Sequence, residues 1–139
     1  MATDAITWQD IIDQDMVPTS NVSHMVIYQI DSKMRLAGTK GYYLPEKDFN
    51  QCIDVFANPQ QYLVDGITLF EGVLDDPLQF LVAKADSRSF YAKRGATSCF
   101  GGRSAGNILL LLFAEPPVLP GRTANALEAL LDYLDEYKI

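Results

Sequence analysis

Apolar residues recur at helical spacing at both ends of the chain. Trp8 and Ile11 belong to a short amphipathic pattern near the N-terminus, which predicts a helix capped by Thr7 or Asp4. At the other end a longer pattern predicts a helix that follows Gly121. Its apolar face consists of Ala124, Leu127, Leu131 and Leu134.

One more helix is predicted in the first half of the chain. Pro45 suits a first helical position, because its missing N–H would have no partner there. The apolar residues that follow it stand at i, i+3, i+4 and i+7, and they are Phe49, Cys52, Ile53 and Phe56. We expect Asn58-Pro59 to end this helix.

Between the helices the pattern favours strands. β-forming residues over 24–30 and 34–37 flank a turn at 31–33 and predict a hairpin. Further strands are predicted at 66–70, 78–84, 89–94, 99–100 and 107–113, with turns at 75–77 and 85–87. The strand at 107–113 is apolar on both faces, which is typical of a buried central strand.

Short links between consecutive strands favour antiparallel pairing. The order of helix, hairpin, helix, meander and helix therefore predicts an α+β fold with a central antiparallel β-sheet and helices packed on its faces. We expect residues 1–139 to form one domain, since no repeat or linker interrupts the pattern.

Composition narrows the possible partners. The chain has 18 acidic and 11 basic residues and a net charge of −7, so nucleic-acid binding and general binding to anionic lipids are not expected. The longest apolar run, 108–114, is far shorter than the roughly 20 residues of a membrane span. The N-terminus does not resemble a signal peptide, so a cytoplasmic location and no membrane span are expected.

The residues that could carry chemistry do not form an enzyme motif. The single histidine, His24, and Cys99 could form a nucleophile pair, but no third group is available to orient them. We therefore expect no catalysis, no cofactor and no metal. Cys52 and Cys99 lie in apolar runs and are interpreted as buried reduced thiols, with a disulfide as the open alternative.

Five segments, in order along the chain, resemble the profilin family. They are "TWQDIID", "GITLFEG", "SFYAKRGATSCFGGRS", "FAEPPVLPG" and "LEALLDYLDEY". The resemblance implies a sheet with the N- and C-terminal helices together on one face and short helices on the other. It also implies an actin-monomer-binding protein that regulates actin polymerisation at the cytoskeleton, with a second surface for proline-rich segments.

Residues matching the family's actin-binding surface fall on the later strands and the last helix. They are Lys93, Arg94, Gly95, Arg103, Glu115, Gly121, Thr123 and Asn125. We expect the predicted hairpin to hold Lys93, Arg94 and Arg103 together as a basic patch that suits acidic actin; the alternative is an ordinary solvated hairpin tip. The segment "VLDDPLQFLV" departs from the family pattern. It carries Asp75 and Asp76 in a region where family members commonly have a basic residue.

The proline-rich-peptide groove is only partly preserved. Trp8, Tyr133 and Leu134 match the family, whereas Ile11, Arg35 and Ile139 replace aromatic residues; a shift of one position would put Leu36 in place of Arg35. Each lost ring removes a surface for proline stacking, so weak or absent polyproline binding is expected, with Tyr137 as a partial replacement. Trp8 could equally serve only to join the two terminal helices.

Other partners remain as expectations. We expect a monomer, and phosphoinositide lipids are not expected as ligands because the net charge is unfavourable. The alternative to an actin-binding protein is an interaction scaffold of the roadblock or longin kind, which has a similar order of elements. Dimerisation in solution and an exposed apolar helix face would favour that alternative.

Overall fold

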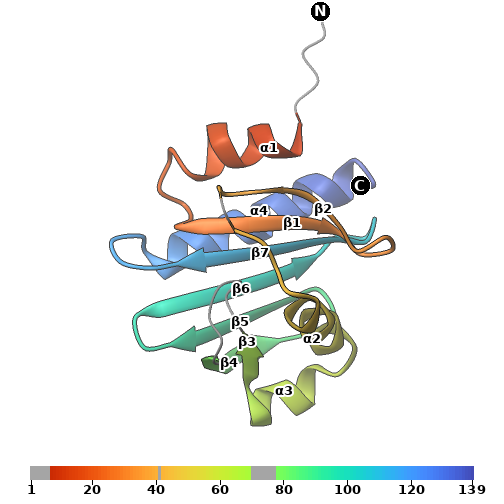
Figure 1. The fold of residues 1–139 in the computed structure, drawn as a ribbon, viewed down its shortest axis with the longest axis vertical. Helices are drawn as coiled ribbons and strands as arrows, with labels where there is room; N and C mark the ends of the chain where they lie inside the picture. The colour runs from red at the N-terminus through yellow and green to blue at the C-terminus, as the bar shows by residue number, and fades with distance from the viewer. Residues whose placement is uncertain (1–6, 41, 70–77) are drawn as a thin grey trace, which may run out of the picture.

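The computed structural model describes residues 7–40, 42–69 and 78–139, and it contains a curved antiparallel sheet with helices on both faces (Figure 1). In the described part seven strands follow the order β2-β1-β7-β6-β5-β4-β3. The strands are β1 His24–Gln29, β2 Met34–Gly38, β3 Ile67–Leu69, β4 Leu78–Ala85, β5 Ser89–Arg94, β6 Thr97–Arg103 and β7 Ile108–Ala114. The helices are α1 Trp8–Asp10, its continuation η1 Ile11–Met16, α2 Glu46–Ala57, α3 Pro59–Asp65 and α4 Pro120–Glu136.

A reciprocal cap begins the N-terminal helix. The Thr7 hydroxyl accepts the Asp10 N–H at 3.1 Å, and the Asp10 carboxylate accepts the Thr7 N–H at 3.0 Å, which together satisfy two N–H groups that the helix leaves without partners. Beyond Asp10 the turns widen to a π-helix, with Val17 N donating to Ile12 O at 3.0 Å. The cap predicted at Thr7 is confirmed, while Asp4 lies outside the described residues.

Helices cover the two faces of the sheet differently. The terminal helices share one face, where Ile12, Met16, Leu127 and Leu131 are buried against the strands. Helix α2 covers the other face with Phe49, Cys52, Val55 and Phe56. β7 is buried along its whole length because its alternate residues point into each layer. This arrangement confirms the predicted α+β class.

Two local predictions need correction. Asn58 does break the helix at 46–57, with φ −134° and ψ 56°, but Pro59 then starts a further helix, α3, that the pattern did not predict. β6 runs over seven residues rather than the two predicted. Residue 70 and the turn predicted at 75–77 lie outside the described residues.

β6 is longer than predicted because its two glycines are strand residues. A Cβ on Gly101 would lie 2.1 Å from the Phe90 ring, and a Cβ on Gly102 would lie 2.8 Å from Leu127 and Leu131. The absence of a side chain at both positions lets an aromatic ring and helix α4 pack closely on opposite faces of one strand.

Candidate functional site

A groove of ≈ 380 Å³ lies between the start of α1 and the end of α4. Its lining consists of Thr7, Trp8, Ile11, Tyr133, Leu134 and Ile139. Tyr133 is 47% exposed and Ile139 is 40% exposed, whereas Leu134 is buried and forms the floor. The structure thus brings together five of the six residues assigned to the peptide groove from sequence.

Arg35, the sixth residue, lies on the other face of the sheet. Its guanidinium donates from Nε and Nη2 to Tyr42 O at 3.1 and 2.9 Å, and it lines a separate cleft beside α2. An irregularity in the pairing of β1 with β2 between Ile27 and Tyr28 shifts the register by one residue. Leu36 therefore packs with the terminal helices, and the assignment of Arg35 to the groove is wrong.

The α4 side of the groove continues into a pair of tyrosines. The rings of Tyr133 and Tyr137 lie 4.9 Å apart at 49°, and Tyr137 is 60% exposed. The chain then folds back, with Ile139 N donating to Leu134 O at 2.8 Å, and packs against Gly106, where a Cβ would lie 2.1 Å from the Ile139 carbonyl carbon. The turn between β6 and β7 thereby holds this wall of the groove in place.

A second exposed surface is the face of β4 and β5 beside α4. The helix packs mainly on β6 and β7, and Leu81 of β4 remains 74% exposed. Leu81 pairs directly with Lys93 of β5, so the two side chains are neighbours on this face. Sequence reasoning assigned Lys93 to the actin-binding surface but missed Leu81, although its place between buried Phe80 and Val82 follows the period of two.

The three basic residues predicted to cluster are separated. Lys93 and Arg94 adjoin the β5–β6 turn at Gly95, whose φ is 60°, whereas Arg103 lies at the far end of β6, about 20 Å away at ~3.3 Å per residue. Lys93 shares a face with Tyr91 on the terminal-helix side, and Arg103 shares the opposite face with Cys99. The expectation that the hairpin holds them together is wrong, because antiparallel pairing puts the two ends of β6 apart.

The other residues assigned to the actin-binding surface lie at the edge where β7 ends and α4 begins. Glu115, Gly121 and Asn125 are exposed there, at the same edge as Gly95, since Ser98 pairs with Ala114. Thr123 is fully buried and donates its hydroxyl to Asn21 O. Its side chain joins α4 to the segment before β1 and does not contribute to an exposed surface.

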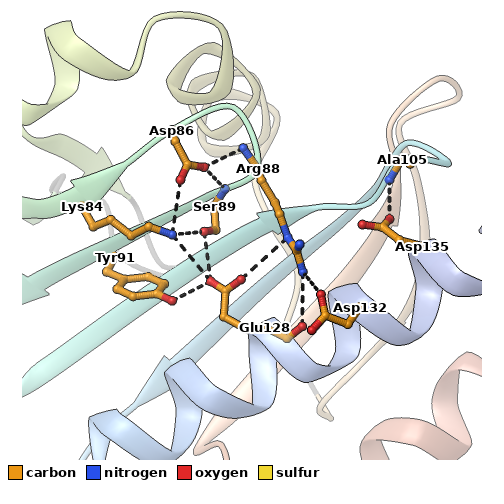
Figure 2. A network of polar contacts seen from close by, with 9 residues as sticks. All are labelled: Lys84, Asp86, Arg88, Ser89, Tyr91, Ala105, Glu128, Asp132 and Asp135. Atoms are coloured by element: carbon orange, nitrogen blue, oxygen red, sulfur yellow. Dashed lines mark hydrogen bonds and ion pairs between the residues drawn. The ribbon is translucent and has the colours of Figure 1, made fainter.

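A polar network, which sequence reasoning also missed, joins α4 to the β4–β5 turn (Figure 2). The Glu128 carboxylate accepts hydrogen bonds from Tyr91 OH at 2.5 Å and from Ser89 Oγ at 3.0 Å. Lys84 donates to Ser89 Oγ at 2.6 Å and lies 3.7 Å from Glu128. Arg88 extends the network along the helix to Asp132, at 2.6 Å.

The network changes the proton affinity of its members. Burial, followed by the hydrogen bond to Glu128, raises the pKa of Tyr91. Asp132 raises the pKa of Arg88. Burial alone would raise the pKa of Asp86, but the N–H groups of Ser89 and Arg88, together with Lys84, lower it overall. These shifts mark a structural ion-pair network, because their causes are burial and the contacts that the members make with one another and with α4.

Comparison with known proteins indicates one family. A family model described as Profilin matches residues 6–139. The chain belongs to the profilin family. Among relatives, Profilin-P of Physarum polycephalum is 27% identical over 131 residues, covering 94% of this chain and 98% of its own length. Profilin-3 of Dictyostelium discoideum is 28% identical over the same share of both chains.

Solved structures show the same fold. Acanthamoeba castellanii profilin IB superimposes with a TM-score of 0.82 at 24% identity, covering 96% of this chain and 100% of that chain. A more distant match is a chain from the crystal structure of a LokiProfilin1–rabbit actin complex, with a TM-score of 0.65 at 14% identity, covering 91% and 93%. The resemblance inferred from the five sequence segments is confirmed.

The imidazole of His24 and the thiols of Cys52 and Cys99 are packed among other side chains of the fold. The His24 ring contacts Phe113, stacked at 4.7 Å, and Tyr42, at 4.6 Å, and those two rings lie 5.4 Å from each other. Burial lowers its pKa, and the nearby Glu115 carboxylate partly opposes that effect. Cys52 and Cys99 are both buried and are not joined by a disulfide, and burial raises the pKa of Cys52.

The described residues contain neither a cluster of metal-ligating side chains nor a helix suited to a bilayer. No three His, Cys, Asp or Glu side chains within 7–40, 42–69 and 78–139 come together as a metal site. Among the helices in those ranges, none combines the length and the apolar character that crossing a bilayer requires.

Proposed function

We propose that this protein binds monomeric actin and regulates its polymerisation, acting as one cytoplasmic, cytoskeleton-associated domain without catalytic activity. Membership of the profilin family supports the proposal, as does the similarity to a chain crystallised in a complex with actin. The roadblock or longin alternative has no comparable support among the relatives named above.

The observation that carries the proposal is the exposed face of β4 and β5. Leu81 is 74% exposed on a face that α4 leaves largely uncovered, because the helix packs mainly on β6 and β7. Here the side chain lies beside Lys93, so the face offers an apolar anchor next to a cation. Interfaces commonly use such a pair, because the apolar group contributes affinity and the charge fixes orientation.

Because Arg103 lies far from Lys93 and Arg94, the three basic residues are not expected to contribute equally to actin binding. Lys93, Arg94 and the exposed start of α4 adjoin this face, and we assign them with Leu81 to the actin contact. Arg103 donates to Asn107 Oδ1 at 3.0 Å at the far end of β6, and we expect it to contribute less than Lys93.

We also propose that binding to uncharged polyproline is weak. Ile11, Leu36 and Ile139 stand where three aromatic rings are expected, and each ring is worth about 1–2 kcal/mol as an anchor. Their combined loss lowers affinity by several powers of ten. Binding to phosphoinositides is not expected with a net charge of −7.

The experiment is binding to purified monomeric actin, measured by sedimentation equilibrium and by slowed spontaneous polymerisation. Leu81→Asp and Lys93→Glu should each weaken binding tenfold or more, which corresponds to about 1.4 kcal/mol. Arg103→Glu should weaken it less. Lys33→Glu, in the exposed turn between β1 and β2, reverses the same charge on the far hairpin and serves as the matched control.

Two outcomes would contradict the proposal. The first is no saturable binding of actin by the folded protein, which would remove the function itself. The second is unchanged binding by the double variant Leu81→Asp/Lys93→Glu, with circular dichroism confirming that it is folded. That result would leave actin binding intact but show that this face does not carry it.

A further inference from the structure

Both walls of the groove between α1 and α4 are acidic. The segment 8–16 contains Asp10, Asp13 and Asp15 and no basic residue, and the six residues before Thr7 contain no lysine or arginine either. The opposite wall, 132–139, has three acidic residues and a single base, Lys138. A ligand lying between these walls therefore experiences a negative potential from two sides.

Several of these carboxylates lack a cationic partner. Arg88 neutralises Asp132 at 2.6 Å, and that residue does not contribute to the field. Asp10 accepts a backbone N–H group, which is a neutral donor and leaves the charge in place. Asp135 accepts the Ala105 N–H and also helps to raise the pKa of Arg88, so its charge is partly balanced. Asp15 and Glu136 are exposed and take part in none of the ion pairs among the described residues.

Asp15 and Glu136 lie on the two helices that form the groove, outside its immediate lining. Asp15 lies four residues after Ile11 in the widened turns of η1 and is exposed. Glu136 follows Tyr133 by three residues and lies beside it on α4. Each of the two helices that form the groove thus carries an exposed carboxylate near the apolar lining.

Aromatic rings exposed in the groove and beside it add a second attraction for cations. Tyr133 and Tyr137 are 47% and 60% exposed, and Trp8 is partly exposed in the same lining. A guanidinium placed over such a ring is attracted by its quadrupole, most strongly over tryptophan. Arginine can therefore use both the ring faces and the carboxylates, which an uncharged proline cannot do.

We propose that this groove binds proline-rich segments carrying arginine or lysine between the prolines, in preference to uncharged polyproline. This proposal rests on one part of the proposed function, the assignment of the groove to proline-rich peptides, and it does not depend on actin binding. A polyproline II ligand repeats every three residues, about 9 Å along its axis. One row of residues then packs on Leu134 and Ile139, while cationic side chains in the other rows reach the walls.

The test is isothermal titration calorimetry with three peptides of equal length at 20 and 200 mM salt. One peptide is decaproline, and the others replace every third proline by arginine or by glutamate. The arginine peptide should bind at least tenfold more tightly than decaproline at low salt, and that advantage should shrink at high salt. The glutamate peptide should bind most weakly.

The decisive variant is Asp15→Asn/Glu136→Gln, with Asp31→Asn/Asp65→Asn as a matched control on distant exposed carboxylates. The first double variant should reduce the arginine peptide's advantage to about threefold or less, and the control should keep it. The proposal is overturned if decaproline binds as tightly as the arginine peptide, if no peptide binds, or if both variants keep the advantage. Actin binding measured on the same samples tests the proposed function separately, since neither double variant changes the β4–β5 face.

Discussion

At the scale of single residues, neighbours decide whether a reactive group has a chemical role. His24 and Cys99 were the only pair that could have suggested a nucleophile. In the sheet His24 pairs with Phe113, which pairs in turn with Cys99, so two strand spacings of ~4.8 Å put the pair about 10 Å apart. The Phe113 ring stacks on the imidazole, and no proton can pass directly between the two side chains.

The imidazole should instead make stability depend on pH. Burial lowers the pKa of His24 below its ordinary 6.5, so the unfolded chain binds a proton more readily than the folded one. The stability contributed by the neutral ring is complete above pH 6.5 and is lost as pH falls through the lower folded pKa. His24→Phe keeps an aromatic ring against Phe113 and Tyr42 and should make the urea-unfolding midpoint depend less steeply on pH between pH 5 and 8. An equally steep decline in the variant would assign the effect to other groups.

At the scale of elements, the predictions that held are those that depend on local spacing. The helix at 46–57 and the strand at 89–94 follow from periodicity within the segment itself. Helix α3 was missed because Pro59 stops one helix and starts the next, which a local rule does not distinguish. The glycines of β6 were missed as strand residues because their role lies in the close approach of Phe90 and α4.

In the candidate site, too, the features set by local spacing were predictable and those set by long-range contacts were not. Most of the groove lining was predictable, because Trp8 and Ile11 share a helix face and Tyr133 and Leu134 lie on the other terminal helix. Arg35 was placed wrongly because a register irregularity in β1–β2 leaves no signal in the sequence. The network around Glu128 joins residues about 40 positions apart, and no local pattern encodes it.

That network should determine how firmly α4 is held. Glu128→Ala removes the acceptor of Tyr91 and Ser89 and leaves Lys84 without its partner on the helix. We expect the free energy of unfolding to fall by about 1–3 kcal/mol, discounted for partial exposure. Chemical denaturation measures it, with Glu136→Ala on the exposed side of the same helix expected to stay within about 0.5 kcal/mol.

A double-mutant cycle makes that prediction sharper. If Tyr91 and Glu128 act together, Tyr91→Phe should cost less in the Glu128→Ala background than in the unaltered protein. The difference should be about 0.5–1.5 kcal/mol. Additive effects would mean that Glu128 acts through its charge or its helix propensity alone.

At the scale of the whole molecule, one sheet separates two hydrophobic layers that share its central strands. β7 sends Leu109, Leu111 and Phe113 toward α2 and Leu110 and Leu112 toward the terminal helices. Loss of either layer therefore removes support from strands that the other layer needs. The groove and the β4–β5 face are both built on this sheet, so both surfaces depend on the same cooperative unit.

Cooperativity can be tested from the layer that lies farther from the groove. Phe56 is buried between α2 and the sheet, near Phe90, and Phe56→Ala should lower the free energy of unfolding by about 3–5 kcal/mol. Trp8, the single tryptophan, reports on the opposite layer through its fluorescence. Because the layers share strands, the fluorescence midpoint should shift as far as the midpoint from far-ultraviolet circular dichroism. If fluorescence keeps the unaltered midpoint while the dichroism shifts, the two layers unfold independently; Phe56→Leu gives the same test should the alanine variant fail to fold.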